Sequence, residues 1–324
     1  MQIQPLFEIQ GEISSSPSKS YSHRAFALAI CARSPSFLIN PLKEGDVGVT
    51  IEFCHAFGGK IEKIDSKNPE FPIGAQETDE VFKIIPPPKL QPAADIINGK
   101  NSGTSIRLMS ALASLLSTET QIVGTFFQRG RPLKPLLDAL AQIGVDYEML
   151  DTPPGVKIRP KHVIPGVIEI PGDISSQFIT GLMTLAPSIP ISGTSDRTTI
   201  ILTTPAKSYP YLQITEEILA TWGILCKSSF DQNLLGSYEI MAGQTYLGRN
   251  YRIPGDFSSA AFIIVLAALN PLPNIIKITN LDMNSPQGDK EIVHILKKMG
   301  AQIEVLPEEQ DRKSTRLNSS HRIR

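Results

Sequence analysis

Cysteine is scarce in this sequence, and the few cysteines lie far apart. The chain has three, Cys31, Cys54 and Cys226, and no two of them form a C-x-x-C pair. An odd and scattered set of this kind argues against a disulfide framework and against a zinc site. A reducing, cytoplasmic setting fits this cysteine usage.

Net charge and long apolar runs are also lacking. Lys and Arg number 31 and Asp and Glu number 32, so no overall field draws the protein to nucleic acid or to an acidic membrane. No apolar run reaches the ~18 residues that a membrane span needs, and the first residues resemble no signal or transit peptide. With 324 residues, 41% of them apolar, we expect a soluble, untargeted protein of two domains.

Four segments share one design, in which a run with helical periodicity ends at glycine and a short alternating strand follows. The glycines that end these runs, which suit a left-handed helix C-cap, are Gly59, Gly144, Gly223 and Gly300. Their intervals of about 80 residues are too long for a solenoid but right for a β-α-β-α-β-β unit. The sequence therefore predicts four such units in a mixed α/β (α+β) fold.

A second series places small hydroxyl residues at the start of an apolar helix, just after a turn. Its members are residues 17–20, 101–105, 171–176 and 254–259. Such a helix start offers unpaired N–H groups and the positive end of the helix dipole, which together suit an anion. Plain N-capping explains any one of them alone. Their recurrence at one place in every unit favours anion binding.

Basic residues accompany two of these helix starts. Lys19 and Arg24 lie on the first, and Arg107 lies in the apolar helix that follows Asn101. For Arg107 we expect a buried anionic partner, because its neighbours Ile106, Leu108 and Met109 are apolar.

Six motifs, in order along the chain, resemble those of the EPSP synthase family, the 3-phosphoshikimate 1-carboxyvinyltransferases. The first, residues 16–24, has the archaeal-like form without the usual Gly before Ser-Lys-Ser. The others are residues 101–107 (N-x-G-T-x-x-R), 131–132 (R-P), 175–178 (S-S-Q-F), 208–211 (S-x-P-Y) and 284–289 (N-S-x-Q-G-D).

This resemblance implies a reaction and a set of site residues. The reaction is transfer of the enolpyruvyl group of phosphoenolpyruvate to the 5-hydroxyl of shikimate 3-phosphate by addition and elimination, without metal or cofactor. Lys19 is implied to be catalytic, as a proton donor. The residues implied to bind shikimate 3-phosphate are Lys19, Ser20, Arg24, Ser175, Ser176, Gln177, Ser208 and Tyr211. Those implied to bind phosphoenolpyruvate are Lys19, Gly103 and Arg131, with Gly103 letting backbone approach the phosphate.

The resemblance also implies an enolpyruvyl transferase-like two-domain fold, in this chain with one domain complete and one partial. We expect residues 14–251 to form a complete three-repeat domain, and residues 1–13 with 252–311 a partial second one. The family's catalytic Asp and its other C-terminal elements are not found before Arg312, so we expect an inactive fragment. We also expect a monomer. The apolar helix at residues 260–266 should then be partly exposed to water.

The last residues, 312–324, are basic and Ser-rich and have no apolar period, so we expect a disordered, non-native tail.

Three other functions stay open at this point. The chain could be a non-catalytic phosphate-binding fragment, or the related transferase that acts on UDP-N-acetylglucosamine. The latter normally has a Lys-Asn pair and a loop cysteine that this chain lacks. Binding of nucleic acid is opposed by the neutral charge and by the lack of interleaved aromatics. Its basic residues would be Lys19, Arg24, Arg107, Arg129 and Arg131.

Overall fold

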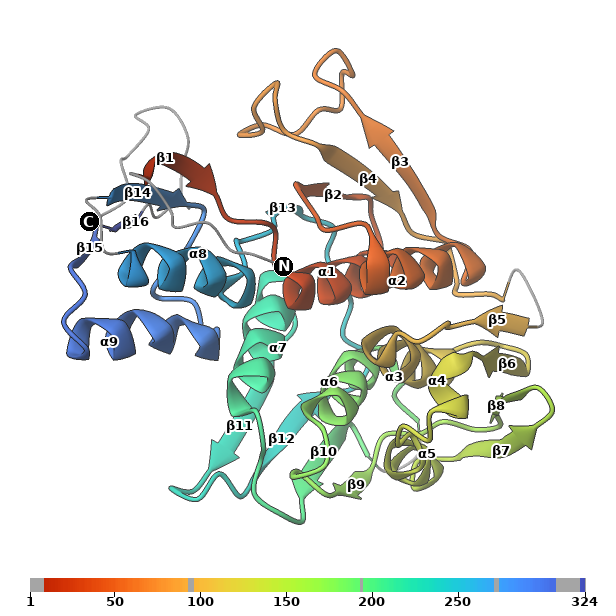
Figure 1. The fold of residues 1–324 in the computed structure, drawn as a ribbon. Coiled ribbons are helices and arrows are strands. Elements are labelled where there is room, and N and C mark those ends of the chain that lie inside the picture. The colour runs from red at the N-terminus through yellow and green to blue at the C-terminus, as the bar shows by residue number, and fades with distance from the viewer. Residues whose placement is uncertain (1–8, 93–95, 193–194, 271–273, 307–320, 324) are drawn as a thin grey trace.

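The computed structural model of the chain describes residues 9–92, 96–192, 195–270, 274–306 and 321–323. Their strands form four sheets of four strands each, and helices pack against every sheet (Figure 1). All four sheets have one topology. In three of them, counted along the chain, the first strand is parallel to the second, which pairs antiparallel with the fourth, which pairs antiparallel with the third. In the remaining sheet a strand from later in the chain takes the place of the first. The predicted mixed α/β fold of four repeated units is confirmed.

The first two units follow each other along the chain, apart from one strand. The first unit comprises α1 (Lys19–Cys31), β2 (Ser36–Ile39), α2 (Gly45–Ala56), β3 (Lys60–Ile64), β4 (Val81–Ile85) and, from much later in the chain, β13 (Asn250–Arg252). The second comprises β5 (Ile96–Asn98), α3 (Gly103–Ala113), β6 (Thr120–Val123), the short α4 (Thr125–Gln128), α5 (Lys134–Ala141), β7 (Val145–Asp151) and β8 (Pro154–Pro160).

The last two units continue the pattern. The third comprises β9 (Val167–Ile170), α6 (Ser176–Leu185), the 3₁₀ turn η1 (Ala186–Ser188), β10 (Arg197–Leu202), α7 (Tyr209–Thr221), β11 (Cys226–Phe230) and β12 (Gly236–Met241). The fourth comprises β1 (Ile9–Ser14), α8 (Phe257–Leu269), β14 (Asn274–Thr279), the 3₁₀ turn η2 (Gly288–Lys290), α9 (Glu291–Lys298), β15 (Ile303–Val305) and β16 (His321–Ile323).

Two chain segments cross between the fourth unit and the rest of the molecule. β1 pairs with β14 in the sheet of the fourth unit, and the chain then continues into α1 of the first unit. β13 pairs with β2 in the sheet of the first unit, and the chain then continues into α8 of the fourth unit. The segments are hydrogen-bonded to each other, because the Ser18 N–H donates to the Pro254 carbonyl at 2.8 Å and the Asp256 N–H to the Ser16 carbonyl at 2.9 Å. At Gly255 a Cβ atom would lie 1.9 Å from the Asn280 carbonyl oxygen, so this position needs glycine.

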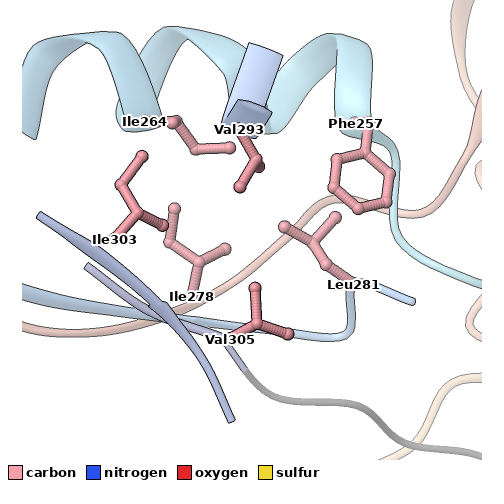
Figure 2. A pocket seen from close by; sticks show the side chains of 7 residues that line it. All are labelled: Phe257, Ile264, Ile278, Leu281, Val293, Ile303 and Val305. Carbon is pink, nitrogen blue, oxygen red and sulfur yellow. The ribbon is translucent and has the colours of Figure 1, made fainter. Parts of the chain in front are cut away.

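The hydrophobic core is divided in the same way as the chain. One large cluster runs through the first three units, whose leading helices α1, α3 and α6 are buried along almost their whole length. A smaller cluster lies beneath α8 and includes Phe257, Ile264, Ile278 and Val293. This smaller core contains a gap of about 10 Å³, and the side chains that line it are all apolar (Figure 2). An apolar gap of that size is a packing defect rather than a ligand site.

The glycines predicted to end the helices do so in three units, with φ of 95° at Gly144, 82° at Gly223 and 99° at Gly300. In the first unit the prediction of Gly59 is wrong, because Gly58 adopts the left-handed conformation there, with φ of 93°. Gly59 is constrained differently: a Cβ atom would lie 2.9 Å from Cγ2 of Ile30, so the glycine permits close packing against α1.

The predicted disorder of the tail is wrong for residues 321–323. They form β16, which pairs antiparallel with both β14 and β15 and takes the place of the fourth strand of the unit. The physical reason is that, without β16, the facing edges of β14 and β15 would have unpaired N–H and C=O groups. An extended segment of any sequence can pair with such edges. The rest of the predicted tail, residues 312–320 and 324, lies outside the described residues.

The apolar helix at residues 260–266 is exposed on one side, as expected. In α8 the side chains of Ala260 and Ile264 are buried, whereas Phe262 is 80% and Leu269 70% exposed. Within the described ranges, no helix has the length and apolar character to cross a membrane.

Candidate functional site

The residues implied to bind substrates all lie at or near helix starts. Lys19 and Ser20 open α1, Gly103 opens α3, and Ser175 is the N-cap of α6, which Ser176 and Gln177 open. Ser208 is the N-cap of α7, and Tyr211 lies in its first turn. Arg24 and Arg131 reach toward these helix starts from the second turn of α1 and from the loop before α5.

Arg24 joins three of these helices and is only 4% exposed. Its guanidinium donates to the Ser20 and Tyr211 carbonyls and to the hydroxyls of Thr180 and Thr215, at 2.9 to 3.0 Å. Burial lowers the pKa of Arg24 to about 10, so the group stays charged near neutral pH. Among the described residues it forms no ion pair with a carboxylate, and each of these four contacts is to a neutral group.

The prediction that Arg107 has a buried anionic partner is wrong. Its guanidinium donates to the Pro132 carbonyl at 2.8 Å and to Oε1 of Gln177 at 2.6 Å, and it lies over the rings of Phe126 and Phe178. These neutral acceptors and aromatic faces replace the carboxylate, since both interact favourably with a guanidinium. Burial and the nearby Arg131 lower the pKa of Arg107 to about 10.

Arg131 lies beside the start of α3. It donates to the Asn101 carbonyl at 2.8 Å, and its guanidinium lies 5.0 Å from the ring centroid of Phe126. A Cβ atom on Gly103 would lie 2.3 Å from Nη2 of Arg131. The glycine at this position therefore makes room for the Arg131 guanidinium, a reason that differs from the predicted approach of backbone to a phosphate.

Gln177 links α6 to α3. Its Nε2 donates to the Thr104 hydroxyl at 2.8 Å, while its Oε1 accepts from Arg107. Both ends of the amide therefore hold neighbouring helices in place. Ser176 is buried at the same helix start, whereas Ser208 and Tyr211 on α7 are exposed. Because Tyr211 is only 36% exposed, desolvation of its partly buried hydroxyl raises its pKa, and so do the carboxylates of Asp289 and Asp256 in the fourth unit.

Side-chain capping accounts for only part of the helix-start series. Ser102 accepts from the Ser105 N–H and Ser175 from the Gln177 N–H, each at 3.3 Å. Ser18 and Asp256, the N-caps of α1 and α8, make no such bond.

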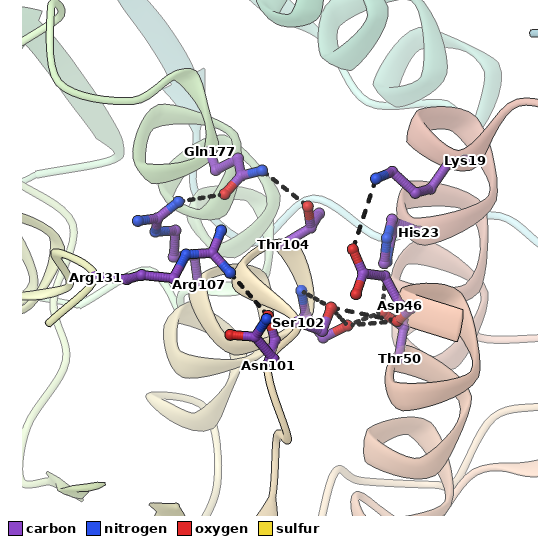
Figure 3. A network of polar contacts seen from close by, with 11 residues as sticks. Lys19, His23, Asp46, Thr50, Asn101, Ser102, Thr104, Arg107, Arg131 and Gln177 are labelled. Carbon is purple, nitrogen blue, oxygen red and sulfur yellow. Dashed lines mark hydrogen bonds and ion pairs between the residues drawn. The ribbon is translucent and has the colours of Figure 1, made fainter. Parts of the chain in front are cut away.

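A polar network joins the starts of α1, α2 and α3 (Figure 3). Nζ of Lys19 lies 3.6 Å from Oδ2 of Asp46, and both side chains are about half exposed. Beneath them, buried hydroxyls link His23 on α1 to Thr50 on α2 and to Ser105 on α3.

Sequence reasoning missed several residues of this arrangement. Asp46 could have been suspected, because an acidic residue in the first turn of a helix that follows a strand is a recognisable signal. Thr180 and Thr215 each lie four residues after a predicted site residue, Ser176 and Tyr211, and so on the same helix face.

The motif at residues 284–289 organises the start of α8. Oε1 of Gln287 accepts from the Phe257 N–H at 3.1 Å, and its Nε2 donates to the Gly255 carbonyl at 2.9 Å. Ser285 approaches the hydroxyl of Tyr21 on α1 at 3.3 Å, and Tyr21 donates to Glu217 on α7 at 2.7 Å. The fourth unit is thereby attached to two of the helices that carry the site.

Two other kinds of feature could form a candidate site, a large cavity and a cluster of metal-ligating side chains. A cavity of about 490 Å³ opens beside the crossing segments, lined by residues 14–17, 40–44, Glu80 and Asn280, and none of the implied site residues lines it. Within the described part of the chain, no three His, Cys, Asp or Glu side chains are placed to hold a metal ion.

Comparisons with known proteins agree with the motifs. The family model described as EPSP synthase (3-phosphoshikimate 1-carboxyvinyltransferase) matches residues 3–322. A 3-phosphoshikimate 1-carboxyvinyltransferase of Methanococcus maripaludis is 37% identical over 92% of this chain and 65% of its own length. One of Methanocaldococcus jannaschii is 36% identical over 92% of this chain and 64% of its own length. The chain thus spans just under two thirds of these curated relatives.

The fold agrees as well. The structure of EPSP synthase from Acinetobacter baumannii superposes with a TM-score of 0.73 at 20% identity, over 98% of this chain and 64% of that one. This likeness confirms the expected enolpyruvyl transferase-like fold. The family model covers nearly the whole chain, and the archaeal relatives share more than a third of the aligned residues. The chain therefore belongs to the EPSP synthase family.

Proposed function

We propose that the protein transfers the enolpyruvyl group of phosphoenolpyruvate to the 5-hydroxyl of shikimate 3-phosphate, releasing phosphate. In this proposal the chain supplies most of the shikimate 3-phosphate pocket and part of the phosphoenolpyruvate pocket. The observation that carries it is the charge at the helix starts. Arg24 lies where α1, α6 and α7 meet, and Arg107 and Arg131 lie near each other at the start of α3. Within the described residues none of the three forms an ion pair with a carboxylate.

A guanidinium group that is buried without a carboxylate partner destabilises the protein, and a bound anion offsets part of that cost. Removing a charge from water costs several kcal/mol, and neutral hydrogen-bond acceptors offset only part of that cost. Both proposed substrates carry a phosphate and a carboxylate, which are the anions that guanidinium groups bind best. Helix starts add N–H donors of the same polarity.

The two pockets follow from which helices meet. Arg24 joins α1 to α6 and α7, where Ser175, Ser176 and Ser208 would bind shikimate 3-phosphate. Arg131 and Gly103 lie at the start of α3, where phosphoenolpyruvate would bind. Gln177 connects the two groups through Thr104 and Arg107, so the substrates would lie side by side. Lys19, at the start of α1, would donate a proton to the reacting carbon.

Calorimetry on the chain tests the assignment of the pockets. Shikimate 3-phosphate should bind at least about tenfold more tightly than shikimate, since a charge-assisted contact contributes about 1.5–3 kcal/mol. In a longer version that includes the C-terminal part of the relatives, Arg131→Gln should lower the affinity for phosphoenolpyruvate about ten- to a hundredfold and leave that for shikimate 3-phosphate unchanged. The control is Arg197→Gln, since Arg197 is an exposed arginine paired with Asp196 and Glu239.

Equal losses for the two substrates would show that Arg131 does not belong to one pocket. A coupled phosphate-release assay separates the enzyme from a non-catalytic phosphate-binding fragment. We expect no release by the chain alone and release by the longer version. Binding of both substrates without release by the longer version would refute the transferase proposal.

A further inference from the structure

Among the described residues, Lys19 has one ionic neighbour, and this neighbour lies outside the family motifs quoted above. This neighbour is Asp46, whose Oδ2 lies 3.6 Å from Nζ of Lys19. Asp46 lies in the first turn of α2, with its carboxylate directed toward Lys19 on α1 (Figure 3). The pair therefore bridges two helix starts.

The backbone of Asp46 is fixed to the start of α3. Its carbonyl oxygen accepts from the Ser105 hydroxyl at 3.0 Å and from the Ser102 hydroxyl at 3.3 Å. Ser102 is the N-cap of α3, next to Gly103, and both serines are buried. The position of the Asp46 carboxylate is thus tied to the helix that carries Gly103.

A buried chain of hydroxyl groups continues from this point back to α1. Ser105 Oγ lies 2.7 Å from Oγ1 of Thr50, which lies 2.6 Å from Nδ1 of His23. A carbonyl oxygen can only accept, so a complete chain runs from His23 through Thr50 and Ser105 to Asp46, with each group donating to the next. His23 lies one turn after Lys19 on α1 and is fully buried. The network therefore closes a ring through α1, α2 and α3.

We propose that Asp46 is a positioning residue for Lys19, and that the chain from His23 through Thr50 and Ser105 holds Asp46 in place. This inference rests on the proposed function for the role of Lys19 toward the substrates. The competing explanation is that Asp46 only stabilises the first turn of α2 through the helix dipole. That explanation predicts no effect on Lys19.

Trace acetylation of the 324-residue chain tests the proposal without substrates and without turnover. The chain is treated with a small amount of isotope-labelled acetic anhydride at pH 7.5, and mass spectrometry gives the rate at each lysine. Asp46→Asn should raise the rate at Lys19 about 1.4- to fivefold, because the amine is released from an exposed ion pair that contributes roughly 0.2–1 kcal/mol. Asp46→Glu, which keeps the charge, should return the rate to near the wild-type value.

Glu52→Gln is the matched control. It removes another carboxylate of α2, and that carboxylate pairs with Lys100 rather than with Lys19. It should raise the rate at Lys100 and leave Lys19 unchanged. Thr50→Val interrupts the hydroxyl chain at nearly constant volume and should raise the rate at Lys19 as well. In the wild-type chain, raising NaCl from 0.02 to 0.5 M should also raise that rate by screening the pair, whether or not a variant folds.

An unchanged rate at Lys19 in folded Asp46→Asn, or in wild type with added salt, would overturn the role of Asp46. An unchanged rate in Thr50→Val would overturn the role of the hydroxyl chain. The proposed function is tested separately, by protection of Lys19 from acetylation when shikimate 3-phosphate and phosphoenolpyruvate are added. If the substrates do not protect Lys19 but Asp46→Asn still raises its rate, the proposed substrates are wrong and the positioning role of Asp46 is supported.

Discussion

His23 should make the stability of the chain fall steeply below pH 6.5. The imidazole is fully buried, and burial, followed by Arg24 and Lys19, lowers its pKa to about 3. In the unfolded chain the pKa is near 6.5, so between pH 6.5 and 3 the unfolded state binds the extra proton. The free energy of unfolding is therefore highest above pH 6.5 and decreases as the pH falls toward 3. From those two pKa values, the loss by pH 5 is about 2 kcal/mol.

Urea unfolding of wild type and His23→Asn, followed by circular dichroism at several pH values from 7.5 to 5, measures this loss. Asparagine keeps a polar group near Thr50 but cannot be protonated, so the variant should lack most of the 2 kcal/mol decrease whatever its stability at pH 7.5. Exposed His55, on α2, provides the control substitution His55→Asn. If His23→Asn and wild type lose the same stability as the pH falls, the pKa of His23 is not lowered in the folded protein, and the reasoning fails.

Three further predictions concern single features. Gly103→Ala places a Cβ atom against Arg131 and should weaken binding of phosphoenolpyruvate but not of shikimate 3-phosphate, as calorimetry would show. Ser102→Ala removes the N-cap of α3 and should cost about 0.5–2 kcal/mol in urea unfolding, whereas the exposed Ser117→Ala should change stability by less than about 0.5 kcal/mol. In hydrogen exchange, amides of α8 should exchange faster than those of α6, because the core beneath α8 is small and Phe262 is exposed; equal protection would contradict this.

The repeated units could be predicted from the sequence because their signals are local. Glycine at a helix end and hydroxyl residues at a helix start each act within one turn, so Gly144, Gly223 and Gly300 and the starts of α3 and α6 were found where the structure has them. The error at Gly59 has the same origin. Two adjacent glycines satisfy the local signal equally well, and only packing against Ile30 on α1 decides between them.

The environment of the charged groups could not be predicted, because it depends on residues far apart in sequence. The partners of Arg24 include Thr180 and Thr215, which lie 156 and 191 residues away. Arg107 was expected to have an anionic partner because charge pairing is the common way to bury a guanidinium. The structure uses an amide oxygen, a carbonyl and two aromatic rings instead, and no pattern of spacing distinguishes these possibilities.

The same neutral surroundings connect stability with the proposed chemistry. An arginine paired with a carboxylate has part of its charge already compensated, and a substrate would have to compete with that carboxylate. Arg24, held by hydroxyls and carbonyls, keeps its position while its charge remains available to an anion. The cost is a buried charge that destabilises the chain by itself. We therefore expect anionic substrates to stabilise this protein more than the number of their contacts suggests, since binding also compensates the buried charge of Arg24.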